Sequence, residues 1–158
     1  MTYDWGVLGA PGPVPGQCSK QYATQWINSL IRSRGAGNGV NLVEISPDHR
    51  FLVVSNREKS LTQSPRFGSG PSDTLSTFAI KEDGTLKLVQ LAPSGGWLPR
   101  QFSFNKAGDK IAVGHQGNQI VIIWKRDVKS GKIVAKDKGG KLGQVQLTGP
   151  VVATIWDE

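Results

Sequence analysis

Two segments of the chain are apolar at almost every position. Residues 51–54 read Phe-Leu-Val-Val, and residues 120–124 read Ile-Val-Ile-Ile-Trp. A strand with one face in water alternates apolar and polar residues, whereas a strand covered on both faces is apolar throughout. The first segment also follows a turn signal, Ser-Pro-Asp, in which proline presets the backbone angle. The pattern therefore predicts two strands, each in a sheet that is packed on both sides.

The surroundings of these two strands repeat. Residues 45–56 and 104–116 each read as a β-prone residue, a turn rich in Pro, Asp or Gly, and an apolar strand that ends in polar residues. Residues 75–89 and 120–134 then each read as a strand, a turn closed by glycine and a shorter strand. Repeats of about 40–60 residues built from four short strands are typical of β-propeller blades. We therefore expect two copies of a four-stranded blade.

The two ends of the chain do not follow this repeat. Residues 1–40 are rich in proline and glycine around a candidate short helix and predict an irregular N-terminal segment, whereas residues 151–156 predict one more strand. The expected fold is all-β: a partial β-propeller in residues 41–158, with about two four-stranded blades plus a closing C-terminal strand. Because a ring needs roughly four to eight blades, we expect either a fragment, which we favour, or self-association through uncovered blade faces.

Composition narrows the class of protein. With 158 residues the chain is long enough for one domain, and its single cysteine excludes an internal disulfide framework and a cysteine-based zinc site. The N-terminal residues show no basic-then-apolar secretory pattern, and the longest aliphatic run is too short to cross a bilayer. We therefore expect a cytoplasmic protein that binds no membrane.

The net charge of +7 raises the question of nucleic acid. Residues 125–141 hold seven Lys or Arg against two Asp, but these charges fall in predicted outer-strand and turn positions, and only Trp124 offers a ring for base stacking. A solvated outer face is the favoured interpretation, and no nucleic-acid partner is expected. No Asp and His cluster has the spacing of metal ligands, so neither a metal nor a cofactor is expected.

Four stretches together resemble a known family. They are residues 44–57 (Glu-Ile-Ser-Pro-Asp-His-Arg-Phe-Leu-Val-Val-Ser-Asn-Arg), 73–80 (Asp-Thr-Leu-Ser-Thr-Phe-Ala-Ile), 95–102 (Gly-Gly-Trp-Leu-Pro-Arg-Gln-Phe) and 113–116 (Val-Gly-His-Gln). In this order, over about residues 41–156, they resemble the seven-bladed lactonase propellers, which include 6-phosphogluconolactonases and fungal carboxy-muconate cyclases. The fungal branch is the most similar. The resemblance implies a small anionic lactone or carboxylate as substrate, with either hydrolase or muconate cycloisomerase chemistry, and a last strand that closes the ring.

Strand connections in a propeller alternate between its two rims, which predicts how distant residues group. Residues 46–50, 82–84, 106–109 and 127–130 should share one rim, and residues 56–73, 92–101 and 116–118 the other. Arg57, Arg100 and Gln116 should therefore meet on one rim, where the family places its substrate. Glu44, taken to lie near the start of an inner strand, should approach the same rim.

Lactone opening needs a base for water, donors for the oxyanion and cations for an anionic substrate. Arg57 and Arg100 suit the last two tasks, because a guanidinium binds such anions in a bidentate manner. Glu44 is the preferred base, since apolar walls would raise its pKa, and His115 is the competing base. The predicted catalytic residues are thus Glu44, Arg57 and Arg100, and Gln116, His115 and Trp97 are predicted to bind substrate.

Each of these residues also has a plainer interpretation. Arg57 could open a solvated loop, Arg100 could cap carbonyl groups, and Glu44 could accept hydrogen bonds between blades. His115 could be a hydrogen-bonded residue at a strand end, and Trp97 could cover a blade edge. The whole chain likewise has an alternative function as a non-catalytic interaction scaffold, or as a truncated inactive product.

Overall fold

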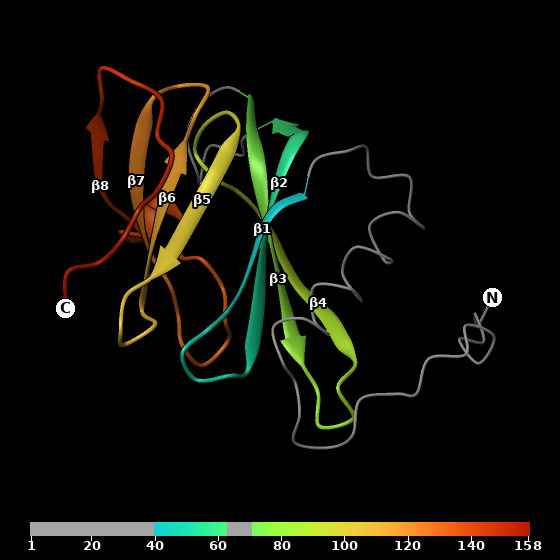
Figure 1. The fold of residues 1–158 in the computed structure, drawn as a ribbon. Coiled ribbons are helices and arrows are strands. Elements are labelled where there is room, and N and C mark those ends of the chain that lie inside the picture. Colours follow the sequence, from blue (N-terminus) through green and yellow to red (C-terminus); the bar gives the residue numbers. More distant parts are fainter. Residues whose placement is uncertain (1–39, 63–70) are drawn as a thin grey trace.

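The computed structural model describes residues 40–62 and 71–158, which form two antiparallel four-stranded sheets (Figure 1). The first sheet consists of β1 (Val40–Ile45), β2 (Phe51–Thr62), β3 (Pro71–Ile80) and β4 (Leu86–Pro93), in that order. The second consists of β5 (Pro99–Phe104), β6 (Lys110–His115), β7 (Ile120–Lys125) and β8 (Lys141–Gln146). A single 3₁₀ turn, η1 (Lys136–Lys138), precedes β8. Sequential antiparallel pairing in two units confirms the prediction of an all-β partial propeller with two blades. The irregular segment predicted for residues 1–40 lies, apart from its last residue, outside the described residues.

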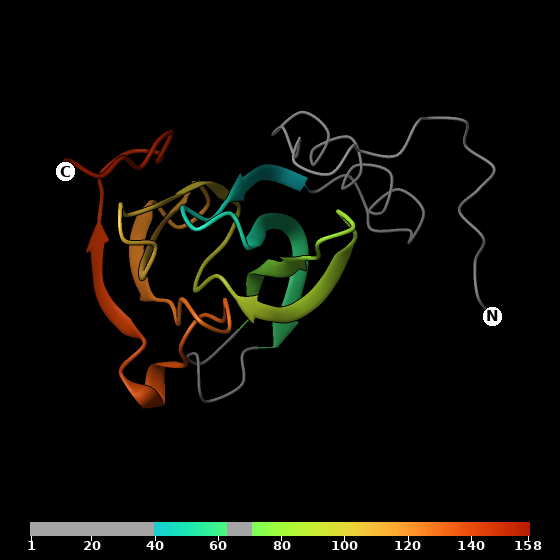
Figure 2. The same ribbon diagram turned by 90° about the horizontal axis from the view of Figure 1, so that it is seen from below.

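The main core lies between the two sheets, which stand as separate layers in Figure 2. Strands β1 and β2 lie against β5. The first sheet contributes Val53, Leu75 and Ala92, and the second contributes Phe102, Ile111, Val113, Ile122 and Trp124, all of them buried. Alternation along each strand produces this seam, because only every second side chain points to it. The seam is the blade-to-blade interface that the apolar runs predicted.

The two apolar runs differ in how fully they are covered. In β2, Val53 faces the seam, while Leu52 and Val54 belong to a second buried cluster on the opposite face. In β7, the even-numbered residues fill the seam, but Val121 and Ile123 on the other face are only half-buried. Coverage on both faces is therefore confirmed for residues 51–54 and holds only in part for residues 120–124.

The connections fall on two rims. On one, which we call the Arg126 rim, the backbone N–H of Arg126 donates to Asp109 O at 2.7 Å, and Arg50 donates to Val128 O. On the other, which we call the Arg57 rim, the N–H of Ser94 donates to Asp73 O at 2.8 Å, and that of Gln116 donates to Leu98 O at 2.9 Å. These bonds join turns that are distant in sequence, and they confirm the predicted grouping of connections.

The prediction of a strand at residues 151–156 is wrong. This segment joins neither sheet; it crosses the face of the second sheet and is held by side chains. Thr154 Oγ1 donates to Ala112 O at 3.3 Å, and Trp156 Nε1 donates to Ser103 O at 3.0 Å. Val151 and Thr154 pack where Gly114 leaves space. Val151 and Thr154 are buried on that face, whereas Val152 and Ile155 are exposed, and packing through side chains forms no backbone ladder.

Most of the lysines in the basic segment point to water. Lys125, Lys129, Lys132, Lys136 and Lys138 are all exposed, as expected for a solvated outer face. Within the described part of the chain, no helix is long and apolar enough to span a membrane.

Candidate functional site

Arg57 and Gln116 meet across the seam on the Arg57 rim. Arg57 Nη2 donates to Gln116 Oε1 at 3.4 Å, a long hydrogen bond between half-buried side chains that are 59 residues apart. Arg57 is four residues beyond Val53 on β2, so the alternation of the strand turns it toward the second sheet. The predicted meeting of these two residues is confirmed.

The residues that precede β5 form a tight loop on this rim, anchored to β3. Asp73 holds both ends of the loop with its backbone: its O accepts from Ser94 N at 2.8 Å, and its N–H donates to Gly96 O at 3.0 Å. The N–H of Gly95 donates to Ser72 Oγ at 2.9 Å. The loop is therefore fixed by buried hydrogen bonds, which makes residues 94–98 a rigid wall of the rim.

Trp97 projects from this wall. Its side chain is 37% exposed, and its backbone N–H donates to Asn118 Oδ1. Its carbonyl oxygen accepts from Gly117 N at 3.1 Å, and a Cβ on Gly117 would come within 2.9 Å of the Trp97 Cβ. The backbones of the two loops thus lie close together while Trp97 remains partly exposed, and its role in binding substrate stays a prediction.

Arg100 is the second residue of β5, at the same end of the sheet. It follows Pro99, which pairs with His115 at the Arg57 rim, and its side chain is exposed. Both predicted arginines therefore lie on the rim that carries Gln116 and Trp97.

His115 has a different environment from the one expected of a substrate ligand. Its side chain is fully buried, with Nε2 at 3.0 Å from Ser94 Oγ, and burial lowers the pKa of the imidazole to about 4. The Ser94–His115 pair has the spacing of a nucleophile and its base. Ser94 is also fully buried, however, so neither side chain reaches the surface. The burial and the hydrogen bond to Ser94 fit the interpretation as a hydrogen-bonded strand-end residue, and we do not include His115 among the groups that contact substrate.

Glu44 is not where the sequence placed it. It is the fifth of six residues in β1 and pairs with Val53, so it lies next to the turn at residues 46–50 on the Arg126 rim. The predicted approach of Glu44 to the Arg57 rim is therefore wrong, because β1 runs toward the opposite rim.

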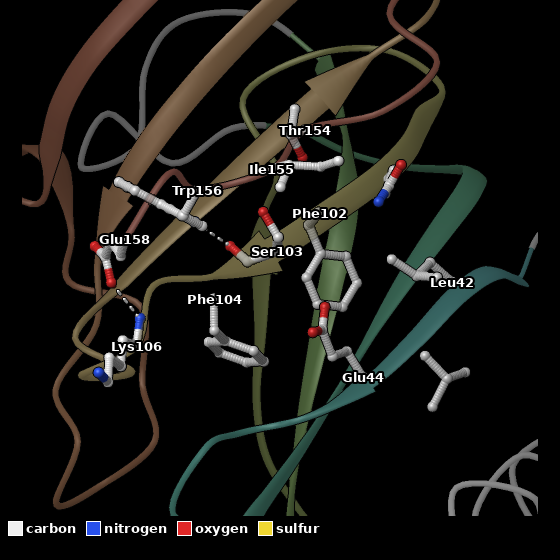
Figure 3. A pocket seen from close by; sticks show the side chains of 12 residues that line it. Leu42, Glu44, Phe102, Ser103, Phe104, Lys106, Thr154, Ile155, Trp156 and Glu158 are labelled. Atoms are coloured by element: carbon white, nitrogen blue, oxygen red, sulfur yellow. Dashed lines mark hydrogen bonds between the residues drawn. The ribbon is translucent and has the colours of Figure 1, made fainter.

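Glu44 instead lines a cavity of about 490 Å³ between β1, β5 and the last residues of the chain (Figure 3). Phe102, Phe104 and Trp156 form its apolar walls, and the N–H of Lys106 donates to Glu158 Oε2 at 2.8 Å at one end. This cavity lies along the inner strands β1 and β5, and Gln101, the neighbour of Arg100, also lines it.

Asp73 is the polar residue of this rim that sequence reasoning did not single out. It is fully buried; its Oδ2 accepts from Leu98 N at 2.7 Å, while its Oδ1 is buried without a hydrogen-bond partner. Leu98 has a positive φ of 52°, a conformation that branched and bulky residues adopt at a cost. The sequence offered one signal, a charged residue near the start of a predicted strand, because aspartate is seldom fully buried unless it is paired.

The described residues contain no group of three His, Cys, Asp or Glu side chains that could hold a metal ion. Among the described residues of the Arg57 rim, the charged side chains that are not fully buried include the guanidinium groups of Arg57 and Arg100, whereas the carboxylate of Asp73 is fully buried. This rim is therefore suited to an anion.

Comparison with known proteins agrees with this architecture. A family model described as "Lactonase, 7-bladed beta-propeller" matches residues 21–147. A 6-phosphogluconolactonase from Formosa agariphila is 36% identical over 93 residues, which cover 58% of this chain and 23% of that protein. An uncharacterized protein of Lactococcus lactis is 32% identical over 115 residues, covering 72% of this chain and 30% of that protein.

Among solved structures, the periplasmic gluconolactonase of Pseudomonas aeruginosa superimposes with a TM-score of 0.56 at 27% identity. The match covers 71% of this chain and 26% of that one. The chain thus spans less than a third of the length of each of these three relatives.

Proposed function

Because this chain belongs to the lactonase family of seven-bladed β-propellers, we propose that its Arg57 rim binds a small anionic lactone, such as 6-phosphogluconolactone, for hydrolysis. The observation that carries the proposal is the contact of Arg57 with Gln116 across the blade seam, on the rim that also holds Arg100 and Trp97. Two relatives bear the names 6-phosphogluconolactonase and gluconolactonase, which supports a sugar lactone as the substrate class.

Each group on the rim has a task in this proposal. The arginines bind the phosphate or carboxylate of the substrate, because a guanidinium presents paired N–H donors that match two oxygens. A guanidinium near the lactone carbonyl also stabilises the negative charge that develops on its oxygen when water attacks. Gln116 fixes one side of the Arg57 guanidinium, and the exposed indole of Trp97 offers an apolar face to the sugar ring.

The position of Glu44 changes the mechanism that the sequence suggested. Glu44 lies toward the turn that ends β1, so the proposal does not assign it the task of deprotonating water at the Arg57 rim. We propose that the described blades supply anion binding and carbonyl polarisation.

The test is to follow hydrolysis of 6-phosphogluconolactone above its spontaneous rate. We expect acceleration by the purified chain, and a loss of tenfold or more in Arg57→Ala and Arg100→Ala. Asp83→Asn is the matched control, since Asp83 is exposed in the β3–β4 turn on the opposite rim. Equal acceleration by the two arginine variants and the control would count against the proposal.

A second candidate function is a protein-interaction scaffold that assembles through its blade faces. The outer side of the second sheet exposes Val145, and the C-terminal segment exposes Val152 and Ile155, the last at 85%. Light scattering separates the candidates: a monodisperse monomer that hydrolyses lactone rules out the scaffold, and a stable inactive oligomer supports it. The cytoplasmic location expected from the sequence stays a prediction, to be checked by fractionation.

A further inference from the structure

Besides His115 Nδ1, the Arg57 rim contains two buried polar atoms without hydrogen-bond partners, and these two belong to side chains of opposite charge. They are Arg57 Nε and Asp73 Oδ1. Buried polar groups in folded proteins are nearly always paired, and a carboxylate oxygen or a guanidinium N–H that is buried alone costs more than a neutral group. Each of these atoms therefore calls for an explanation.

The register of β2 and β3 places the two side chains on the same face. Asn56 pairs with Thr74, and the ladder has a register shift just beyond this pair. Arg57 and Asp73 are the next residues along their strands toward the rim, without forming a paired position. Val53 and Leu75, which share the parity of Arg57 and Asp73, both point into the seam. Arg57 and Asp73 thus face the second sheet together, with a donor on one strand and an acceptor on the other.

The rest of Asp73 is committed to the loop that carries Trp97. Its Oδ2 accepts from the N–H of Leu98 at 2.7 Å, and its backbone holds both Ser94 and Gly96. Asp73 Oδ2 is therefore bound to the loop at residues 94–98. Asp73 Oδ1 has no hydrogen-bond partner, and its side chain shares a face with Arg57.

We propose that Asp73 is the positioning residue of the Arg57 rim. Its Oδ2 fixes the loop that presents Trp97, and its Oδ1 holds Arg57 through one bridging water that accepts from the Nε–H group and donates to Oδ1. Arg57 is then held on two sides, by Asp73 and by Gln116, and its outer N–H groups stay directed at the substrate anion. This inference rests on the proposed function, because it assigns Arg57 the task of binding that anion.

The experiment uses Asp73→Asn, which separates the two tasks of the carboxylate. The amide oxygen of asparagine still accepts from Leu98 N–H, but its NH₂ group is a donor and cannot accept from the bridging water. Binding of 6-phosphogluconate, the hydrolysis product, is measured by calorimetry. We expect Asp73→Asn to weaken binding at least fivefold, while the control Asp83→Asn leaves it unchanged.

The sign of this change is decisive. Removing a negative charge beside an anion site would by itself tighten anion binding, so unchanged or tighter binding in Asp73→Asn overturns the proposal. A double-mutant cycle adds a second criterion. In an Arg57→Ala background, Asp73→Asn should have no further effect on affinity. An equal loss with and without Arg57 would show that Asp73 acts only through the fold.

A readout without ligand separates this inference from the proposed function. If the wild-type chain neither hydrolyses the lactone nor binds 6-phosphogluconate, the proposed function fails, and the ¹⁵N–¹H signal of Arg57 Nε decides the inference. That signal, assigned by its absence in Arg57→Lys, should exchange with water at least tenfold more slowly than in free arginine. Asp73→Asn should remove most of this protection. Free-arginine exchange in the wild-type chain overturns the inference even where the variant does not fold.

Discussion

The guanidinium carbon of Arg126 lies 5.0 Å from the centre of the Phe51 ring, across the seam between the two blades. The same group lies 5.4 Å from the Phe104 ring, and its Nη1 donates to Gly108 O at 2.8 Å. Arg126 is only 2% exposed, and burial lowers the pKa of its guanidinium. A desolvated cation between two aromatic rings is a strong form of cation–π contact. Arg126 therefore joins the blades at the rim opposite to the candidate site.

Replacing this arginine tests its contribution to stability. We expect Arg126→Ala to lower the free energy of unfolding by about 2–4 kcal/mol, because it removes the ring contacts and leaves a cavity in the seam. Urea unfolding followed by tryptophan fluorescence measures the change. Lys129→Ala is the control: this residue is exposed to solvent, so a loss below about 1 kcal/mol is expected. Equal losses in the two variants would contradict the role of Arg126.

His115 makes stability depend on pH. The unfolded chain protonates this imidazole below a pKa of 6.5, whereas in the folded state burial lowers the pKa to about 4. The unfolded state therefore binds more protons between these values, and the free energy of unfolding falls by about 3 kcal/mol as the pH drops from 6.5 to 4. His115→Gln should flatten the curve in this window, and the exposed His49→Gln should leave the slope as it is. A curve unchanged by His115→Gln would show that the imidazole is not the group responsible.

Gly114 tests how the C-terminal segment is held. A Cβ at this position would lie 2.5 Å from Val151 Cγ1 and 3.1 Å from Thr154 Cγ2. Gly114→Val should therefore displace residues 151–158, with a stability loss of about 1–3 kcal/mol, while β6 keeps its ladder. Limited proteolysis should then cleave the segment faster. Gly143→Ala on β8 has nothing within 4 Å of its new Cβ and should behave like wild type.

Gly96 tests whether the loop wall matters for anion binding. A Cβ here would lie 2.8 Å from the His115 ring and 2.9 Å from Asn118 Oδ1, so Gly96→Ala must shift the loop that carries Trp97. We expect at least a fivefold weaker affinity for 6-phosphogluconate in calorimetry, together with altered indole fluorescence. Gly149→Ala, which meets no atom within 4 Å, serves as the control. An unchanged affinity in Gly96→Ala would show that the position of the loop that carries Trp97 does not affect anion binding.

The sequence by itself determined the two blades and the way their connections divide between the rims. Apolar runs such as residues 120–124 and turns such as Asp83-Gly84 are local signals, because side-chain alternation and backbone angles depend on a few neighbouring residues. Strand order then follows from short antiparallel connections. For this reason the sequence alone predicts that Arg57 and Gln116, which are 59 residues apart, lie on one rim.

Only the tertiary structure decided which residues face the site. Glu44 lies on the wrong rim because the register of β1 against β2 sets where its side chain falls, and His115 is withdrawn from solvent because the loop at residues 94–98 closes over it. Residues 151–156 have the apolar pattern of a strand, but they lie across a sheet face and join neither sheet. Burial, register and unpaired polar atoms such as Asp73 Oδ1 arise from contacts between distant segments, so no local pattern in the chain encodes them.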